Sequence, residues 1–116
     1  MIIVDSALAE RVREDNPVRV GVVGAGFSGS RIVHQIVTAV PGLRVVAVAN
    51  RTQAHAEAAY RLAGVERTRR VTDPTALQRS IGARDYAVTE DPDVLWNCPD
   101  VDVVIEATGT DRKSVV

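Results

Sequence analysis

The sequence predicts an α/β fold in three layers: a doubly wound parallel sheet with helices on both faces. Three observations predict it. Short valine-rich runs alternate with helical repeats, as in strand–helix–strand units. A glycine-rich turn joins the first such run to the first repeat. Aromatic residues make up only 3% of the chain, so valine and alanine must supply the core, as in buried parallel strands.

The elements follow one another with few irregularities. Residues 1–16 are expected to form a helical extension that Asp5 or Ser6 caps and Pro17 ends. Strands are expected at 18–23, 43–49, 86–88 and 101–106. Helices are expected at 28–40, 53–63, 74–80 and 89–97, with Thr52 capping the second and Thr72 or Asp73 the third. The strand order should be 3-2-1-4, which is part of a larger doubly wound sheet.

The glycine-rich turn after the first strand has the spacing G-x-G-x-x-G. Gly24 allows a tight turn, Gly26 lets the backbone approach a pyrophosphate, and Gly29 lets the helix pack close to the strand. The amides at the start of the helix, including those of Phe27 and Ser28, favour a negative ligand. The turn therefore predicts a Rossmann-type dinucleotide site, the alternative being a turn that only packs well.

The residues after the second strand bear on which dinucleotide binds. Enzymes that use NAD usually have Asp or Glu there, for the ribose 2′-hydroxyl. This chain has Asn50, Arg51 and Thr52 instead. Asn50 does not repel a 2′-phosphate, Arg51 offers a planar cation for it, and Thr52 offers a hydroxyl. NADP is therefore favoured over NAD, the alternative for Arg51 being a solvated surface residue.

The fourth strand leads into Ala107, Thr108 and Gly109, at the edge where the first strand ends. Small residues there would let the middle of the cofactor lie close to the backbone. An ordinary small-residue strand end is an equally good interpretation.

Other polar residues give no comparable signal. His34 and His55 lack a second metal ligand, and Cys98 lacks a neighbouring base, so a buried or idle thiol is expected. Trp96 is expected to pack its helix against the sheet. Residues 65–82 are interpreted as an insertion whose arginines form a solvated charge run. The alternative is that the arginines fold over Arg51 and assist the phosphate; they are Arg67, Arg69 and Arg70.

Composition excludes several function classes. The net charge of −1 gives no basis for binding nucleic acid or an anionic membrane, and no segment is apolar enough to cross a bilayer. The single cysteine makes an internal disulfide impossible, and the chain starts without a signal-peptide pattern. A cytoplasmic location is expected.

Taken together, residues 16–29, 40–51 and 100–109 resemble the start of homoserine-dehydrogenase-like oxidoreductases. The likeness is greatest to the branch that ends in a SAF domain and includes deoxyxylulose-phosphate-reductoisomerase-like enzymes. The resemblance implies a longer protein that passes a hydride between NADP(H) and a small carbonyl or hydroxyl substrate. It implies that the glycine turn holds the pyrophosphate, that Asn50 and Arg51 face the 2′-phosphate, and that no catalytic residue lies in this segment.

The resemblance also sets the expected domain limits. Residues 17–110 would be an incomplete NAD(P)-binding domain, and the substrate domain would be missing. Residues 111–116 read as the translation of a sequencing adapter, so a non-native tail is expected. The fourth strand would then be an exposed edge that favours self-association. Two other functions stay open. One is a dinucleotide-sensing module without turnover. The other is a methyltransferase domain, which Asn50 and Arg51 disfavour because such domains usually have an acidic residue at the end of the second strand.

Overall fold

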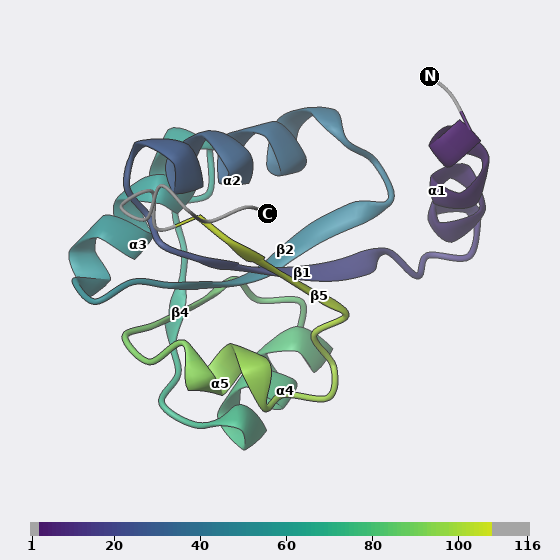
Figure 1. Cartoon of the computed structure of the whole chain (residues 1–116). Helices are drawn as coiled ribbons and strands as arrows, with labels where there is room; N and C mark the ends of the chain where they lie inside the picture. The colour runs from purple at the N-terminus through teal and green to yellow at the C-terminus, as the bar shows by residue number, and fades with distance from the viewer. Residues whose placement is uncertain (1–2, 108–116) are drawn as a thin grey trace.

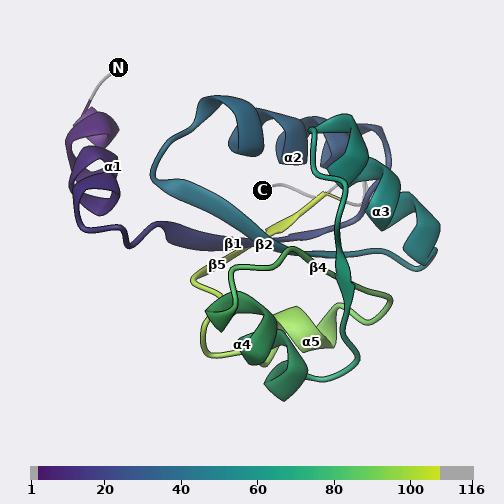
Figure 2. The ribbon, with the colours of Figure 1, turned by 180° about the vertical axis from the view of Figure 1, so that it is seen from behind.

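The computed structural model describes residues 3–107 and shows a parallel sheet between two layers of helices (Figures 1 and 2). Helices α2 and α3 cover one face of the sheet, α4 and α5 cover the other, and α1 lies to one side. The strands are β1 (Val18–Val23), β2 (Leu43–Ala49), β3 (Arg69–Arg70), β4 (Ala87–Thr89) and β5 (Val103–Glu106). The helices are α1 (Ile3–Arg13), α2 (Phe27–Ala39), α3 (Gln53–Leu62), α4 (Pro74–Gly82) and α5 (Asp93–Trp96).

The strand order is β3-β4-β2-β1-β5. The four predicted strands therefore lie in the predicted order, and the three-layer α/β class is confirmed. The difference is β3, a two-residue edge strand inside the segment that was interpreted as an insertion. It pairs in parallel with β4, through Arg69 opposite Ala87 and Arg70 opposite Val88.

The core forms on both faces of the central strands because parallel strands are covered on both sides. Residues 45–49 of β2 are all at most 1% exposed. Val48 packs with Val33 of α2 and Tyr60 of α3, whereas Val46 packs in the cluster on the α4 and α5 face. The Tyr60 hydroxyl donates to the Ala87 carbonyl at 3.0 Å, which satisfies the one polar atom of this buried ring.

The helix ends differ from the predictions in several places. α1 begins at Ile3, before the expected caps Asp5 and Ser6, and ends at Arg13. Asp73 caps α4 as predicted, and its carboxylate accepts from the Ala76 amide at 2.7 Å. Thr52 occupies the N-cap position of α3 but makes no side-chain capping bond. None of the described helices is long and apolar enough to cross a membrane.

The prediction for Trp96 is wrong, because this side chain is 56% exposed. α5 has only four residues, and Val94 and Leu95 are the ones that pack beneath the sheet. A β-carbon at Gly21 would lie 2.7 Å from Leu95 Cδ2, so the glycine makes room for this contact. Cys98 is buried as expected, and burial raises the pKa of its thiol.

An ion pair joins Arg19 of β1 to Asp102, the residue before β5. Asp102 Oδ2 accepts from the Arg19 amide at 2.9 Å and from Nε at 3.2 Å, and Oδ1 accepts from Nη2 at 3.3 Å. Burial disfavours the Asp102 carboxylate, but the hydrogen bonds and charge of Arg19 outweigh burial and lower the pKa of Asp102. Both side chains are about one-third exposed, so the gain in stability is small.

We predict that Asp102→Asn lowers the free energy of unfolding by about 0.5–1 kcal/mol at pH 7. Because the folded-state pKa of Asp102 is lowered, its contribution is present above the unfolded value of about 3.9 and is lost as the pH falls through the folded-state pKa. Urea unfolding at several pH values measures this. Asp100→Asn is the control, since it removes the same charge from a side chain without a hydrogen bond to Arg19 in the described structure. A difference from wild type that persists in strong acid would contradict the prediction.

Candidate dinucleotide site

The glycine turn begins where β1 ends, at the carboxyl edge of the sheet. Gly24 has a φ of +100°, a conformation that favours glycine, and its amide donates to the Ala49 carbonyl at 2.7 Å. Gly29 is buried against the turn: a β-carbon there would overlap the Gly24 carbonyl oxygen and lie 2.7 Å from its carbon. These two glycines therefore allow α2 to start directly above the end of β1.

The start of α2 provides backbone donors for an anion. Gly26 is the N-cap residue, no side chain caps the helix, and its first turn has no acidic residue. A β-carbon at Gly26 would meet no atom within 4 Å, so the space beside it is open to a ligand. Phe27 and Ser28, the first helical residues, are exposed at this end. The uncapped amides and the helix dipole suit a pyrophosphate.

Asn50 has a structural part in the turn. Its Oδ1 accepts from the Ala25 amide at 2.9 Å, and its Nδ2 donates to the Thr52 carbonyl at 2.9 Å. The predicted contact of Asn50 with a 2′-phosphate would have to compete with these bonds. The side chain ties the glycine turn to the loop after β2, and Asn50 also lines the cleft beside this turn.

Arg51 lines a cleft of about 500 Å³ between the glycine turn and the loops after β2 and β4. The side chain is exposed and makes no hydrogen bond or ion pair with any residue in the described range 3–107. Gly26 opens into the same cleft, so one ligand can contact the turn and Arg51 together. Thr52 is exposed but does not line the cleft.

Two residues that line this cleft after β4 were not predicted to do so, and one on α3 was set aside. Glu90 and Pro92 line it from the loop after β4, and His55 lines it from α3. Glu90 directly follows a parallel strand, and such strands end at one edge, so its position in the sequence was a usable signal. His55 is exposed, and the described residues include no group of three metal ligands, so nothing here assigns it to a metal.

The end of β5 lies beneath the glycine turn. The Ala107 amide donates to the Val23 carbonyl at 2.7 Å. A β-carbon added at Gly29 would lie 3.8 Å from the β-carbon of Ala107. Ala107 is buried, so it supports the turn from below. Thr108 and Gly109, the other two residues predicted here, lie outside the described residues, as does the tail at 111–116.

Residues 18–113 match an oxidoreductase family with an NAD-binding Rossmann fold, Gfo/Idh/MocA. The chain belongs to this family. The match supports the coarser part of the expected resemblance, an oxidoreductase cofactor domain, and it leaves the homoserine-dehydrogenase-like branch as a prediction.

This chain is also similar to a solved structure of a dehydrogenase. That structure is myo-inositol dehydrogenase from Lactobacillus casei in complex with NAD(H) and myo-inositol, with a TM-score of 0.59 and 26% sequence identity. The likeness covers 80% of this chain but only 22% of that one. A search of curated proteins gave no match.

The arginines of the predicted charge run are exposed, and two of them have acidic partners. Arg69 Nε lies 2.7 Å from Asp85, and Arg70 Nη2 lies 3.7 Å from Glu90. Arg67 lines a separate hollow with Arg69 and Asp85. The run is thus solvated, as expected, but Arg70 reaches a residue of the cleft.

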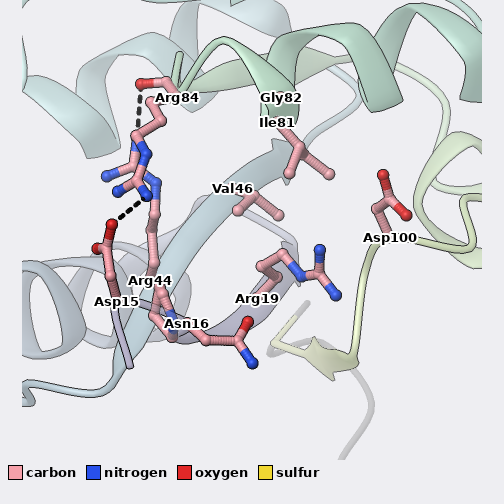
Figure 3. A pocket seen from close by; sticks show the side chains of 10 residues that line it. Asp15, Asn16, Arg19, Arg44, Val46, Ile81, Gly82, Arg84 and Asp100 are labelled. Carbon is pink, nitrogen blue, oxygen red and sulfur yellow. Dashed lines mark hydrogen bonds and ion pairs between the residues drawn. The ribbon is translucent and has the colours of Figure 1, made fainter. Parts of the chain in front are cut away.

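A second cavity, of about 260 Å³, lies near the start of β1 and β2 (Figure 3). Its charges are largely paired: Arg84 contacts Asp15 at 2.8 Å, and Arg44 donates to the Arg84 carbonyl at 2.6 Å. Arg19, which also lines it, is bonded to Asp102. This cavity is at the opposite end of the strands from the glycine turn, so the cleft beside Arg51 is the better candidate for the cofactor.

We predict that one glycine substitution in the turn weakens dinucleotide binding and another weakens folding stability. Gly26→Ala places a methyl group in open space and should change stability by about 1 kcal/mol or less, while weakening NADH and NADPH binding at least tenfold (~1.4 kcal/mol). Gly29→Ala forces a backbone overlap and should destabilise the fold by about 3 kcal/mol. Urea unfolding and dinucleotide titration measure both effects. Normal dinucleotide affinity in Gly26→Ala would place the ligand elsewhere.

Proposed function

We propose that this chain is the cofactor domain of an NADP(H)-dependent oxidoreductase. The single observation that carries the proposal is the cleft in which the glycine turn and Arg51 face the same space. The family match and the Rossmann-type sheet support the oxidoreductase class. Bound there, the cofactor supplies a hydride donor or acceptor, and the residues of this chain bind and orient it.

The residues present fit such a group. Gly26 leaves room for close approach, and the uncapped start of α2 offers amides to the pyrophosphate. Arg51 has no acidic partner in the described residues, so its guanidinium is available to a 2′-phosphate. The loop after β2 has no carboxylate between residues 50 and 52 that would repel this phosphate.

Two observations favour NAD(H) as the second candidate. Glu90 lines the cleft, and a carboxylate there can accept from ribose hydroxyls and repel a phosphate. The similar myo-inositol dehydrogenase was solved with NAD(H). Arg51 and Glu90 thus act in opposite directions on cofactor choice, and the choice is decided by binding measurements.

The full protein is proposed to act on a small carbonyl or hydroxyl compound. The chain spans 22% of the length of the myo-inositol dehydrogenase, so the substrate and catalytic groups would come from sequence beyond this segment. The resemblance to the SAF-containing branch adds a more specific proposal. Assaying the product of the complete gene with polyols and with homoserine-like substrates tests it, and turnover of neither class would oppose it.

We predict that the chain binds NADPH at least tenfold tighter than NADH, a difference of about 1.4 kcal/mol. Arg51→Ala should remove this preference by weakening NADPH alone, because only NADPH carries the 2′-phosphate. Isothermal calorimetry measures all four affinities. Arg61→Ala is the control: it removes the same charge from the last turn of α3, outside the cleft. Equal affinities in the wild-type chain, or equal losses in both variants, would contradict the assignment of Arg51.

A further inference from the structure

We propose that Arg70 is a specificity-determining residue, which favours a 2′-phosphate in the cleft by neutralising Glu90. The inference rests on the proposed function, since it concerns how the same cleft selects its dinucleotide. Arg70 does not line the cleft; it acts through Glu90, which does.

Three neighbouring parallel strands bring the charges to one edge. Arg51 follows β2 after one residue, Glu90 directly follows β4, and Arg70 ends β3. The strand ends are joined by backbone hydrogen bonds from Asn50 to Thr89 at 3.0 Å and from Val71 to Val88 at 2.9 Å. Glu90 therefore lies between a cation across the cleft and a cation on the edge strand.

The loop that carries Glu90 is held on both sides. The Thr89 hydroxyl is on a residue only 1% exposed and accepts from the Asp91 amide at 3.2 Å. The Asp91 carboxylate then accepts from the Asp93 amide at 2.9 Å, at the start of α5. The backbone on both sides of Glu90 is thereby held without any contribution from Arg70.

The charges decide the expected effect. A lone Glu90 carboxylate would repel a 2′-phosphate, and the Arg70 guanidinium 3.7 Å away offsets that charge. The side chains are 62% and 55% exposed, so solvent and salt weaken the effect. A modest, salt-sensitive change in the ratio of NADPH to NADH affinity follows.

The neighbouring arginines are not placed for this role. Arg69 is paired with Asp85, and residues alternate sides along a strand, so Arg69 and Arg70 point to opposite faces. Arg67 precedes β3 and lines the separate hollow beside Asp85. Arg67→Gln is therefore a matched control with the same change in net charge.

The test is calorimetry of NADPH and NADH with wild type, Arg70→Gln, Glu90→Gln, the double variant and Arg67→Gln, at low and high salt. We expect Arg70→Gln to lower the NADPH-to-NADH affinity ratio about two- to fivefold at low salt, without weakening NADH binding or shifting the unfolding midpoint. The double variant should restore the ratio, and high salt should erase the difference. Arg67→Gln should match wild type.

The outcomes separate this inference from the proposed function. If wild type prefers NADPH but Arg70→Gln leaves the ratio unchanged, the role of Arg70 is overturned and that of Arg51 stands. If the double variant keeps the loss, Arg70 does not act through Glu90 and the inference is also overturned. Equal wild-type affinities with a lower ratio in Arg70→Gln support Arg70 and oppose Arg51. Absence of binding by folded wild type overturns both.

Discussion

The geometry of the cleft depends on the two hydrogen bonds of the Asn50 side-chain amide. It accepts from Ala25 in the glycine turn and donates to Thr52 in the loop after β2. The turn is thus held from the β2 side, while Gly29 lets α2 press on it from above and Ala107 supports it from below. An amide serves here because it has one donor and one acceptor group, whereas a carboxylate would have no donor for the Thr52 carbonyl.

This arrangement leaves the next residue available to a ligand. Asn50 also lines the cleft, but its side chain is bonded to the turn and to the loop after β2, so Arg51 is the first cleft-lining side chain after β2 without a hydrogen bond to another described residue. The parallel sheet then places Glu90 on the other side of the same cleft, because β2 and β4 are neighbours and end at one edge. In the proposed function, cofactor choice depends on the charges of Arg51 and Glu90 at these strand ends, and Arg70 on the edge strand shifts that balance through Glu90.

Much of the fold could be predicted because buried parallel strands appear in the sequence as runs rich in valine and alanine. The four predicted strands and their order follow from these runs. β3 could not be predicted, since two arginines carry no apolar pattern and the strand exists through backbone pairing with β4. The exposure of Trp96 was missed for a related reason: a four-residue helix is too short for periodicity to show which side packs.

The site was predictable to a different extent at each residue. The turn was predictable from the spacing of its glycines: backbone geometry demands glycine at Gly24 and Gly29, and Gly26 leaves open space for a ligand. The bonds of Asn50 were not, because an amide can serve a ligand or the protein and the sequence does not show which. Glu90 was missed although it directly follows a strand, because its place in the sequence does not show whether the side chain lines the cleft.

An amide chemical-shift titration of the ¹⁵N-labelled chain with NADPH tests where the cofactor binds. The largest changes are expected on residues 24–26, on Arg51 and His55, and on Glu90, which surround one cleft. Changes centred instead on Arg19, Arg44 and Arg84, at the other end of the strands, would place the ligand in the second cavity and not in the cleft beside Arg51.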